Sequence, residues 1–267
     1  MNTPESLTKE TLASFYAVKP ASVYHLDDYI IPAGGWRNFN DFFAREVKKG
    51  ARPIASPTDP SVVVSPADAV WDGSWPVDNA DDVTTFVTSK GIPWPIQTLL
   101  ADSEYANHFQ GGTFTHSFLN TTDYHRQHAP VAGKVLEAKV IQGLCYLEVV
   151  SEPAANGPVL SMRRKLDAPD DPGYQFIQSR GLVIIESEIG LVAVLPIGMA
   201  QVSSVVLTVA KGATLEKGEE ISYFQLGGSD IVMVFQAGAN VKFPGIEPGK
   251  VHFNQGKQLA TATPMVF

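Results

Sequence analysis

The hydrophobic pattern of the chain changes at about residue 61. From there on, short runs rich in Val, Ile and Leu alternate with Gly, Pro, Asn and Asp, which is typical of short strands joined by turns. The runs predict strands near residues 61–65, 133–141, 144–150, 182–186, 191–195, 202–209, 219–225, 231–236 and 240–243. An antiparallel β-rich core, arranged as a sandwich or a barrel, follows from this pattern.

Helical signals are concentrated before this core. They occur where a capping residue precedes apolar residues at helical spacing, and they predict helices over residues 3–18, 38–50 and part of 96–106. Asn38 marks the second of these, because it can cap a helix together with Asp41 three residues on. We therefore expect an α+β fold that is predominantly β, with a helical region at residues 1–60 packed on a β-rich core at residues 61–267.

Composition narrows the classes of partner. The 267 residues carry a formal net charge of −8, with a pI of about 5.2, and no cluster of Lys and Arg opposes this charge. Nucleic-acid binding is therefore not expected, and contact with an anionic membrane is expected to be peripheral at most. The N-terminus has no secretory signal pattern and no apolar run approaches the roughly 18 residues of a membrane span, so we expect a cytoplasmic protein. Cys145 is the single cysteine, which excludes an intrachain disulfide.

Three polar features stand out against the apolar pattern. They are Asp68 at the end of a strand, the group His125-Arg126-Gln127-His128, and Ser229 after two glycines. An acid, a base and a hydroxyl group from distant parts of a chain can act together in nucleophilic catalysis if the fold joins them. Each also has a structural interpretation, since Asp68 can cap a turn, a histidine can be hydrogen-bonded in a core, and Gly-Gly-Ser can form a tight turn.

A metal site and a hydrolase are two alternatives for these residues. The histidines at positions 125 and 128 are three apart, whereas zinc sites on helices more often space them by four, and no acidic residue has ligand-like spacing. We therefore predict no metal. The G-x-S-x-G turn of α/β-hydrolases is absent, which disfavours that class.

Six stretches of the chain form an ordered set. They are Phe42-Phe43-Ala44-Arg45 with Lys48-Lys49-Gly50-Ala51-Arg52-Pro53-Ile54, then Ser65-Pro66-Ala67-Asp68, Ser89-Lys90-Gly91 ahead of Leu99-Leu100, residues 123–133, residues 196–205, and Lys217-Gly218-Glu219-Glu220 leading to Gly227-Gly228-Ser229. In this order they resemble the motifs of the phosphatidylserine decarboxylase family. The resemblance covers residues 39 to 236, and six motifs in register are far more specific than any one.

The resemblance implies an enzyme that makes its own cofactor. In the family, the serine at the position of Ser229 attacks the carbonyl of the preceding glycine, here Gly228, and the chain is cut to leave a pyruvoyl group at the start of residues 229–267. Gly228 offers an unhindered carbonyl for this step. By similarity, His128 is the base and Asp68 orients it.

The pyruvoyl ketone would form a Schiff base with the amine of the substrate and accept the electrons released when carbon dioxide leaves. His125 is our candidate for contacting the substrate or protonating the product. The family's default reaction converts phosphatidylserine to phosphatidylethanolamine. Relatives also suggest a homodimer.

Departures from the family pattern keep other functions open. Asp230 stands where Thr or Ser commonly follows the cleavage serine, Ser203 stands where the membrane enzymes usually carry Gly, and their anchoring segment is missing. The first alternative is a soluble decarboxylase of a free aromatic amino acid such as tryptophan, with Trp94 and Asp230 as candidate pocket residues, although Trp94 and Trp71 are also typical core residues. The second alternative, from another class, is a processing-deficient member that acts as a binding module.

Overall fold

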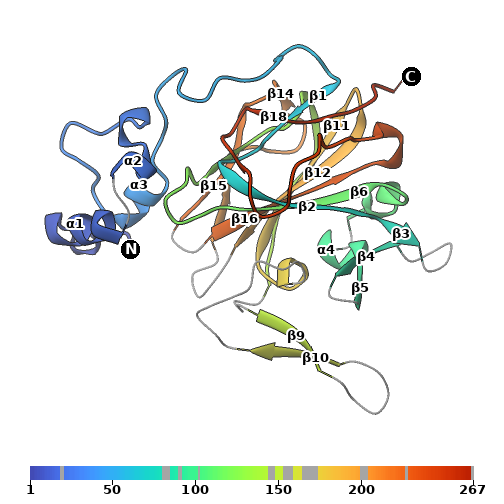
Figure 1. Ribbon diagram of the computed structural model, residues 1–267, viewed down its shortest axis with the longest axis horizontal. Coiled ribbons are helices and arrows are strands. Elements are labelled where there is room, and N and C mark those ends of the chain that lie inside the picture. Colours follow the sequence, from blue (N-terminus) through green and yellow to red (C-terminus); the bar gives the residue numbers. More distant parts are fainter. Residues whose placement is uncertain are drawn as a thin grey trace.

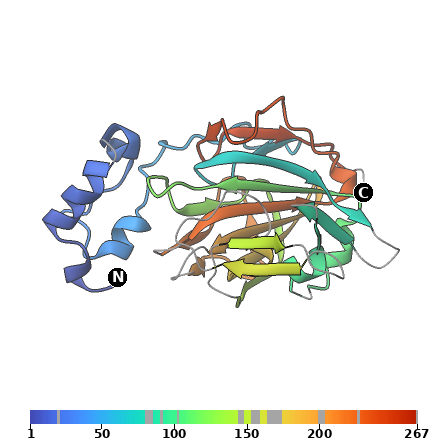
Figure 2. The same cartoon turned by 60° about the horizontal axis from the view of Figure 1, so that its bottom comes forward.

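The computed structural model describes residues 1–18, 21–79, 85–89, 92–101, 103–143, 148–152, 159–163, 174–198, 204–225 and 228–265. Most of them form a β body, and helices α1 (Lys9–Val18), α2 (Ala21–Tyr24) and α3 (Phe39–Phe43) gather at one side of it (Figures 1 and 2). The predicted class, predominantly β with helices near the N-terminus, is confirmed.

Eight antiparallel strands form one sheet that curls into a half-barrel (Figure 1). In spatial order they are β14 (Thr214–Leu215), β8 (Gly133–Ile141), β11 (Arg180–Ser187), β12 (Gly190–Gly198), β16 (Gly228–Phe235), β6 (Thr113–Phe118), β2 (Ala69–Pro76) and β17 (His252–Phe253). Strand β12 is apolar along its whole length, and β11 and β16 carry long apolar runs, because a hydrophobic cluster covers each face of the sheet. On β16, Met233 points into one cluster, and its neighbours Val232 and Val234 point into the other.

Smaller elements complete the fold. The remaining strands are β1 (Val62–Val64), β3 (Asp78–Asn79), β4 (Thr85–Ser89), β5 (Ile92–Pro95), β7 (Arg126–His128), β9 (Glu148–Glu152), β10 (Val159–Arg163), β13 (Val205–Leu207), β15 (Glu220–Phe224) and β18 (Gln258–Thr261). Strand β15 pairs with both β13 and β7, and β18 pairs with β1. The short helices are α4 (Ile96–Leu99), η1 (Pro4–Ser6), η2 (Leu26–Asp28), η3 (Ala106–Phe109), η4 (Tyr174–Phe176) and η6 (Ala237–Ala239). None of the helices in the described ranges has the length and apolar character needed to cross a membrane.

The predicted capping of the second helix is confirmed, but its predicted length is wrong. Oδ1 of Asn38 accepts a hydrogen bond from the backbone N–H of Asp41 at 2.9 Å, and such a cap is worth about 1 kcal/mol. The helix nevertheless ends at Phe43 and does not reach Gly50. Val47 instead forms a β-bridge with Tyr29, so pairing with a distant segment ends the helical pattern.

Most predicted strands correspond to observed ones. Of the strand predicted at 202–209, the first two residues, including Ser203, lie outside the described residues. Two other predictions differ from the structure. The segment predicted at 240–243 is not a strand, because Asn240 adopts a left-handed conformation and only Lys242 makes an isolated bridge to Thr261. The strand predicted at 144–150 lies partly outside the described residues, as does Cys145, and β9 begins at Glu148. Strands β2 and β6 are not among the predicted strands.

The helical region is tied to the β body through arginine side chains. Nη2 of Arg45 donates to the carbonyl oxygens of Thr122 and Asp123, at 2.9 and 3.1 Å. In the other direction, Nε of Arg126 donates to the carbonyl of Ala44 at 2.9 Å. These bonds hold the N-terminal helices against the segment that carries the predicted histidine motif.

Candidate active site

The histidine motif and the predicted cleavage segment converge along two routes. His125 precedes β7, whose neighbour β15 leads towards Gly228, and the backbone N–H of Phe224 at the end of β15 donates to the carbonyl of His125 at 2.9 Å. On the other side, Asp230 near the start of β16 pairs with Phe118, the last residue of β6, from which the chain continues to the histidines. The fold therefore brings the motif and the start of β16 to the same end of the β body.

A β-bulge falls on Ser229. In the ladder between β12 and β16, Ile197 pairs with Asp230. The next pair is Gly198 with Gly228, so Ser229 is an extra residue on the β16 side. Bulges disrupt the ladder locally and are frequent next to active sites. The bond between Gly228 and Ser229 thus lies at an irregularity of a central strand.

His128 is held at both ring nitrogens. Nδ1 lies 2.8 Å from the carbonyl oxygen of Gly218, and because a carbonyl can only accept, Nδ1 carries the proton. Nε2 is therefore the unprotonated nitrogen, and the hydroxyl of Tyr124 donates to it at 3.0 Å. Burial lowers the pKa of His128, so the ring is neutral at pH 7. A neutral histidine with one defined basic nitrogen is suited to the predicted role as a base.

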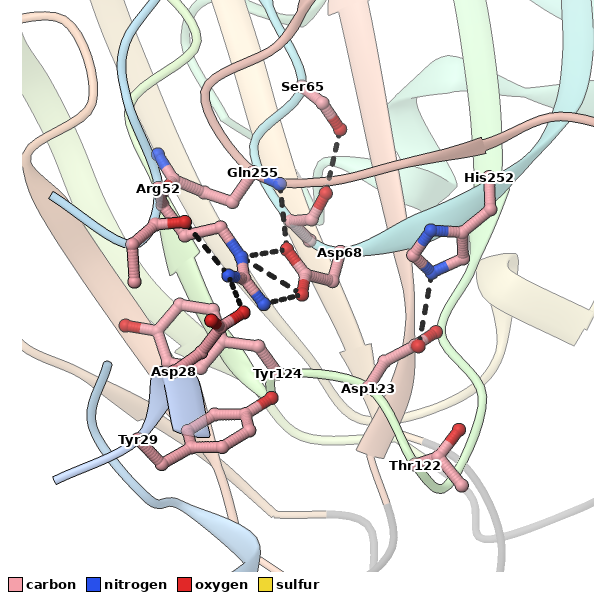
Figure 3. A network of polar contacts seen from close by, with 12 residues as sticks. Asp28, Tyr29, Arg52, Ser65, Asp68, Thr122, Asp123, Tyr124, His252 and Gln255 are labelled. Carbon is pink, nitrogen blue, oxygen red and sulfur yellow. Dashed lines mark hydrogen bonds and ion pairs between the residues drawn. The ribbon is translucent and has the colours of Figure 1, made fainter. Parts of the chain in front are cut away.

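Asp68 is buried, but its carboxylate is engaged by other groups than His128 (Figure 3). Arg52 donates to it through Nε at 2.9 Å and Nη2 at 2.6 Å, and the backbone N–H of Gln255 donates at 2.7 Å. Arg52 also donates to Asp28 at 2.8 Å. The expected direct orientation of His128 by Asp68 is not seen, and Asp68 acts on the ring through space, where its negative charge favours the protonated form.

His125 is fully buried and stacks on Phe43, with the ring centroids 3.9 Å apart. Neither ring nitrogen has a hydrogen-bonding partner among the described residues. Burial, together with the positive charge of Arg45, lowers the pKa of His125 to about 3, so the ring is neutral. Buried nitrogens without a hydrogen-bonding partner in the described part of the chain are able to bind a substrate group.

A second buried set of charges, the Asp72–His116–Asp230 cluster, lies on the face of the sheet opposite Phe43. Nδ1 of His116 lies 2.7 Å from Asp72, and Nε2 lies 3.2 Å from Asp230. The side-chain amide of Gln175 is 2.9 Å from Nε2. Burial lowers the pKa of His116, but the two carboxylates outweigh it and raise the value to about 9. The cluster is thus an imidazolium paired with two carboxylates. One of these carboxylates belongs to Asp230, the residue that follows the predicted cleavage serine.

Another bulge explains how this cluster forms. In the ladder between β2 and β6, Trp71 pairs with Ser117 and Gly73 pairs with His116, so Asp72 is the extra residue. A bulge redirects a side chain, and here the redirected carboxylate meets the imidazole. Asp230 departs from the family motif in the sequence, but its contacts with the cluster residues on β2 and β6 were not predicted. Among the described residues, no group of His, Cys, Asp and Glu side chains is arranged to hold a metal ion.

Comparison with known proteins decides the family. A family model described as phosphatidylserine decarboxylase matches residues 39–261. The phosphatidylserine decarboxylase proenzyme of Fusobacterium nucleatum is 32% identical over 237 residues, which cover 88% of this chain and 70% of the relative. The chain belongs to the phosphatidylserine decarboxylase family. Members of this family are pyruvoyl-dependent carboxy-lyases whose pyruvoyl group comes from a self-cleaved serine.

Two further relatives differ in whether their names include a substrate. Phosphatidylserine decarboxylase proenzyme 3 of Schizosaccharomyces pombe is 34% identical over 213 residues, and Decarboxylase iboD of Amanita muscaria is 32% identical over 219 residues. Each match covers 79% of this chain, but only 20% of the first relative and 61% of the second. Membership of the phosphatidylserine decarboxylase family therefore establishes the class of enzyme and not the substrate.

The candidate pocket residue Trp94 lies in the core of this phosphatidylserine decarboxylase family member. It is 7% exposed and stacks on Phe176 with a centroid distance of 5.3 Å. Its indole Nε1 has no hydrogen-bonding partner among the described residues. Trp71 is also buried and stacks on Phe243 at 4.6 Å. Trp94 shares its hydrophobic cluster with Val232, two residues after Asp230 on β16, so the two candidate pocket residues lie on the same face of the sheet.

Two cavities of about 390 Å³ each border the histidine motif. The first lies between the helical region and β15, and its lining includes Trp36, Arg126 and Gln225. Gln225, in its lining, precedes the predicted cleavage bond by three residues in the sequence. The second is lined by Asp68 and Asp123 among others, on the side of the network in Figure 3.

Proposed function

We propose that this chain is a pyruvoyl-dependent decarboxylase that cuts itself between Gly228 and Ser229. The bulge at Ser229 is the observation that carries this proposal, because it sets the attacking serine at an irregular position of β16 directly after a glycine. The neutral ring of His128, and the ring nitrogens of His125 that have no partner within the described ranges, support their two roles.

The self-cleavage would be an acyl shift followed by an elimination. Oγ of Ser229 attacks the carbonyl carbon of Gly228, and the nitrogen of Ser229 leaves as an amine, so an ester replaces the peptide bond. His128 takes the hydroxyl proton at Nε2 and returns it to the departing nitrogen. Loss of the α-proton of Ser229 then expels the carboxylate of Gly228, and hydrolysis of the resulting dehydroalanine gives the pyruvoyl group and ammonia.

The residues around the new chain start would support decarboxylation. The pyruvoyl group, once formed, supplies an electron sink for the loss of carbon dioxide. His125 would hold the substrate through a ring nitrogen and deliver a proton to the product carbon. Its low pKa means that it must accept this proton from another group first, since the free ring is neutral.

Phosphatidylserine is the first candidate substrate. The names of two relatives support it, and so does the cavity beside Gln225. That cavity combines the apolar side chains of Ile30 and Trp36 with the guanidinium groups of Arg37 and Arg126. Arg37 also pairs with Asp41, and Arg126 pairs with Glu46 and Glu220, so a phosphate would share these groups with carboxylates. An apolar wall next to guanidinium groups matches a phosphate that is attached to an acyl-bearing glycerol.

A free amino acid is the second candidate, and the Asp72–His116–Asp230 cluster favours it. Two carboxylates face one imidazolium, and Asp230 is the residue next to Ser229. A phosphodiester bound next to Asp230 would therefore meet a carboxylate in a buried region, where charges interact strongly. An aromatic amino acid such as tryptophan lacks that phosphodiester.

Denaturing electrophoresis with intact mass measurement tests the proposed cleavage. We expect two fragments, residues 1–228 and residues 229–267, the second beginning with a pyruvoyl group. Ser229→Ala and His128→Ala should each leave one full-length chain. A wild-type protein that stays uncut with an unmodified Ser229 after prolonged incubation would refute the decarboxylase and leave the binding module.

Carbon dioxide release then separates the two substrates. We expect the processed protein to release carbon dioxide from phosphatidylserine vesicles faster than from free tryptophan, tyrosine or phenylalanine. Activity confined to the free amino acids would reject the lipid and support the second candidate.

A further inference from the structure

Tyr124 is the hydrogen-bonding partner of the basic nitrogen of His128, and its hydroxyl occupies the lone pair that would accept an incoming proton. The proton on Nδ1 is fixed by the carbonyl of Gly218, so only Nε2 can accept a proton from serine. That nitrogen already receives the hydroxyl proton of Tyr124 at 3.0 Å. Direct transfer from Ser229 to His128 would therefore require the tyrosine hydroxyl to leave.

The surroundings of Tyr124 hold it in place. The side chain is 2% exposed, and its ring lies 6.2 Å from the ring of Tyr29 and 5.9 Å from the guanidinium carbon of Arg52. Arg52 is itself fixed by Asp68 and Asp28. Burial raises the pKa of Tyr124, so the hydroxyl remains protonated and can donate. The phenolic oxygen still has acceptor capacity after this donation, and it can take a hydrogen bond from another hydroxyl group.

We propose that Tyr124 relays the proton between Ser229 and His128 during self-cleavage, an inference that rests on the cleavage proposed above. As Oγ of Ser229 attacks Gly228, its proton passes to the phenolic oxygen, and the phenolic proton passes to Nε2. The tyrosine is neutral before and after the step, and His128 becomes the imidazolium. When the amine of Ser229 departs, the proton returns along the same route, and the step ends with an ester, a neutral amine and a neutral His128.

This arrangement also gives the network of Figure 3 a function. Asp68 does not bond to His128, but it fixes Arg52, and Arg52 lies over the ring of Tyr124. The acid of the motif would thus position the relay instead of the base. Asp68 is a positioning residue in this scheme, and Tyr124 is the group that exchanges protons with the reacting serine.

The test is the cleavage rate of Tyr124→Phe, with Tyr29→Phe as the matched control. Both variants remove one buried phenolic hydroxyl from neighbouring rings, but only Tyr124 contacts His128. Freshly synthesised wild type and both variants are followed by denaturing electrophoresis, and circular dichroism confirms that each is folded. We expect Tyr124→Phe to cleave at least about tenfold more slowly, in line with the loss of one acid–base group, and Tyr29→Phe to cleave at the wild-type rate.

A pH profile reports whether the hydroxyl of Tyr124 acts on the basic nitrogen of His128. The tyrosine hydrogen bond stabilises the neutral ring, so its loss should move the pH of half-maximal cleavage upwards in Tyr124→Phe. Equal or faster cleavage in a folded Tyr124→Phe would overturn the relay, because the hydroxyl would then only block Nε2. If the wild type itself is not cut, the proposed function fails and the relay with it.

Hydroxylamine identifies the step that Tyr124 serves. This reagent cleaves esters, so it cuts any chain in which the acyl shift has occurred but the elimination has not. We expect hydroxylamine to leave Tyr124→Phe as slow as before, because the relay acts in the acyl shift. Cutting at the wild-type rate in its presence would show that the shift does not need Tyr124 and would refute the relay.

Discussion

Two histidines that are equally buried, His116 and His125, have opposite charge states on opposite faces of the sheet. His116 lies between two carboxylates, which raise its pKa to about 9 against the effect of burial. His125 lies against Phe43 without a hydrogen-bonding partner among the described residues, and burial lowers its pKa to about 3. Burial alone therefore does not set the charge. The carboxylates beside His116 keep its ring charged, whereas burial without a charged acceptor keeps the ring of His125 neutral.

Removing the charged histidine should have the largest effect. His116→Leu leaves the carboxylates of Asp72 and Asp230 buried without their cation, and breaking a buried pair in this way costs about 3–5 kcal/mol. Urea unfolding in a Ser229→Ala background, which keeps the chain uncut, measures this loss. The double variant His116→Leu with Asp230→Leu should recover part of it, and no recovery would show that the two charges are not coupled.

The alkaline limb of the stability curve should report the same cluster. A raised pKa means that His116 stabilises the fold fully below its unfolded value of about 6.5 and loses this contribution as the pH rises to about 9, a change of roughly 3 kcal/mol. Unfolding free energies between pH 6 and 9.5 check this in the uncut background. In the double variant His116→Gln with Asp230→Asn, the free energy of unfolding should change less over this pH range. An unchanged slope would contradict the raised pKa of His116.

The neutral histidine should matter more for activity than for stability. His125→Leu removes a buried imidazole that forms no side-chain hydrogen bond within the described part of the chain, so the free energy of unfolding at pH 7 should change by no more than about 1 kcal/mol. Decarboxylation by the processed protein should fall about a hundredfold or more, as expected for a lost acid–base group. Because the lowered pKa makes the wild type lose stability as the pH falls from about 6.5 towards 3, His125→Leu should lose less over that range. A large loss of stability at pH 7 together with full activity would show that His125 serves the fold and not the reaction.

Replacing the exposed His252 should have the smallest effect on the free energy of unfolding, and comparison with His116 shows how much burial contributes. His252 pairs with Asp123 at 3.0 Å, the same chemistry as in the cluster, but its side chain is 37% exposed. Asp123 raises the pKa of His252. His252→Asn should change the unfolding free energy by less than about 1 kcal/mol, as is usual for exposed ion pairs. A cost as large as that of His116→Leu would show that depth below the surface does not distinguish the two pairs.

Those parts of the fold that a single local pattern determines could be predicted from the sequence. The apolar runs of β11, β12 and β16 could be recognised because both faces of these strands are covered, and Asn38 could be recognised from its spacing to Asp41. Strand β2 was missed because the bulge at Asp72 breaks its alternation, and β6 was missed because it buries polar residues such as His116. The predicted helix to Gly50 failed because a bridge to a distant strand residue decided the conformation of its second half.

The candidate site, like the fold, could be predicted only where a local sequence pattern indicates it. Motif order indicated Asp68, His125, His128 and the Gly228–Ser229 bond, whose roles stay predictions until they are measured. Three-dimensional contacts that no local pattern encodes added the rest. The hydroxyl of Tyr124 on Nε2 depends on the tautomer fixed by Gly218, a residue far along the chain. The partners of Asp230 come from β2 and β6, whose registers the sequence could not supply.

Strand β16 lies between β12 and β6 and is paired on both sides. A cut before Ser229 would leave residues 229–267 held by these two ladders, and by β17 on β2 and β18 on β1. One translated chain would then become a heterodimer without any assembly step. Its unfolding would release two molecules from one, so its melting temperature would rise with protein concentration, whereas that of the uncut chain would not.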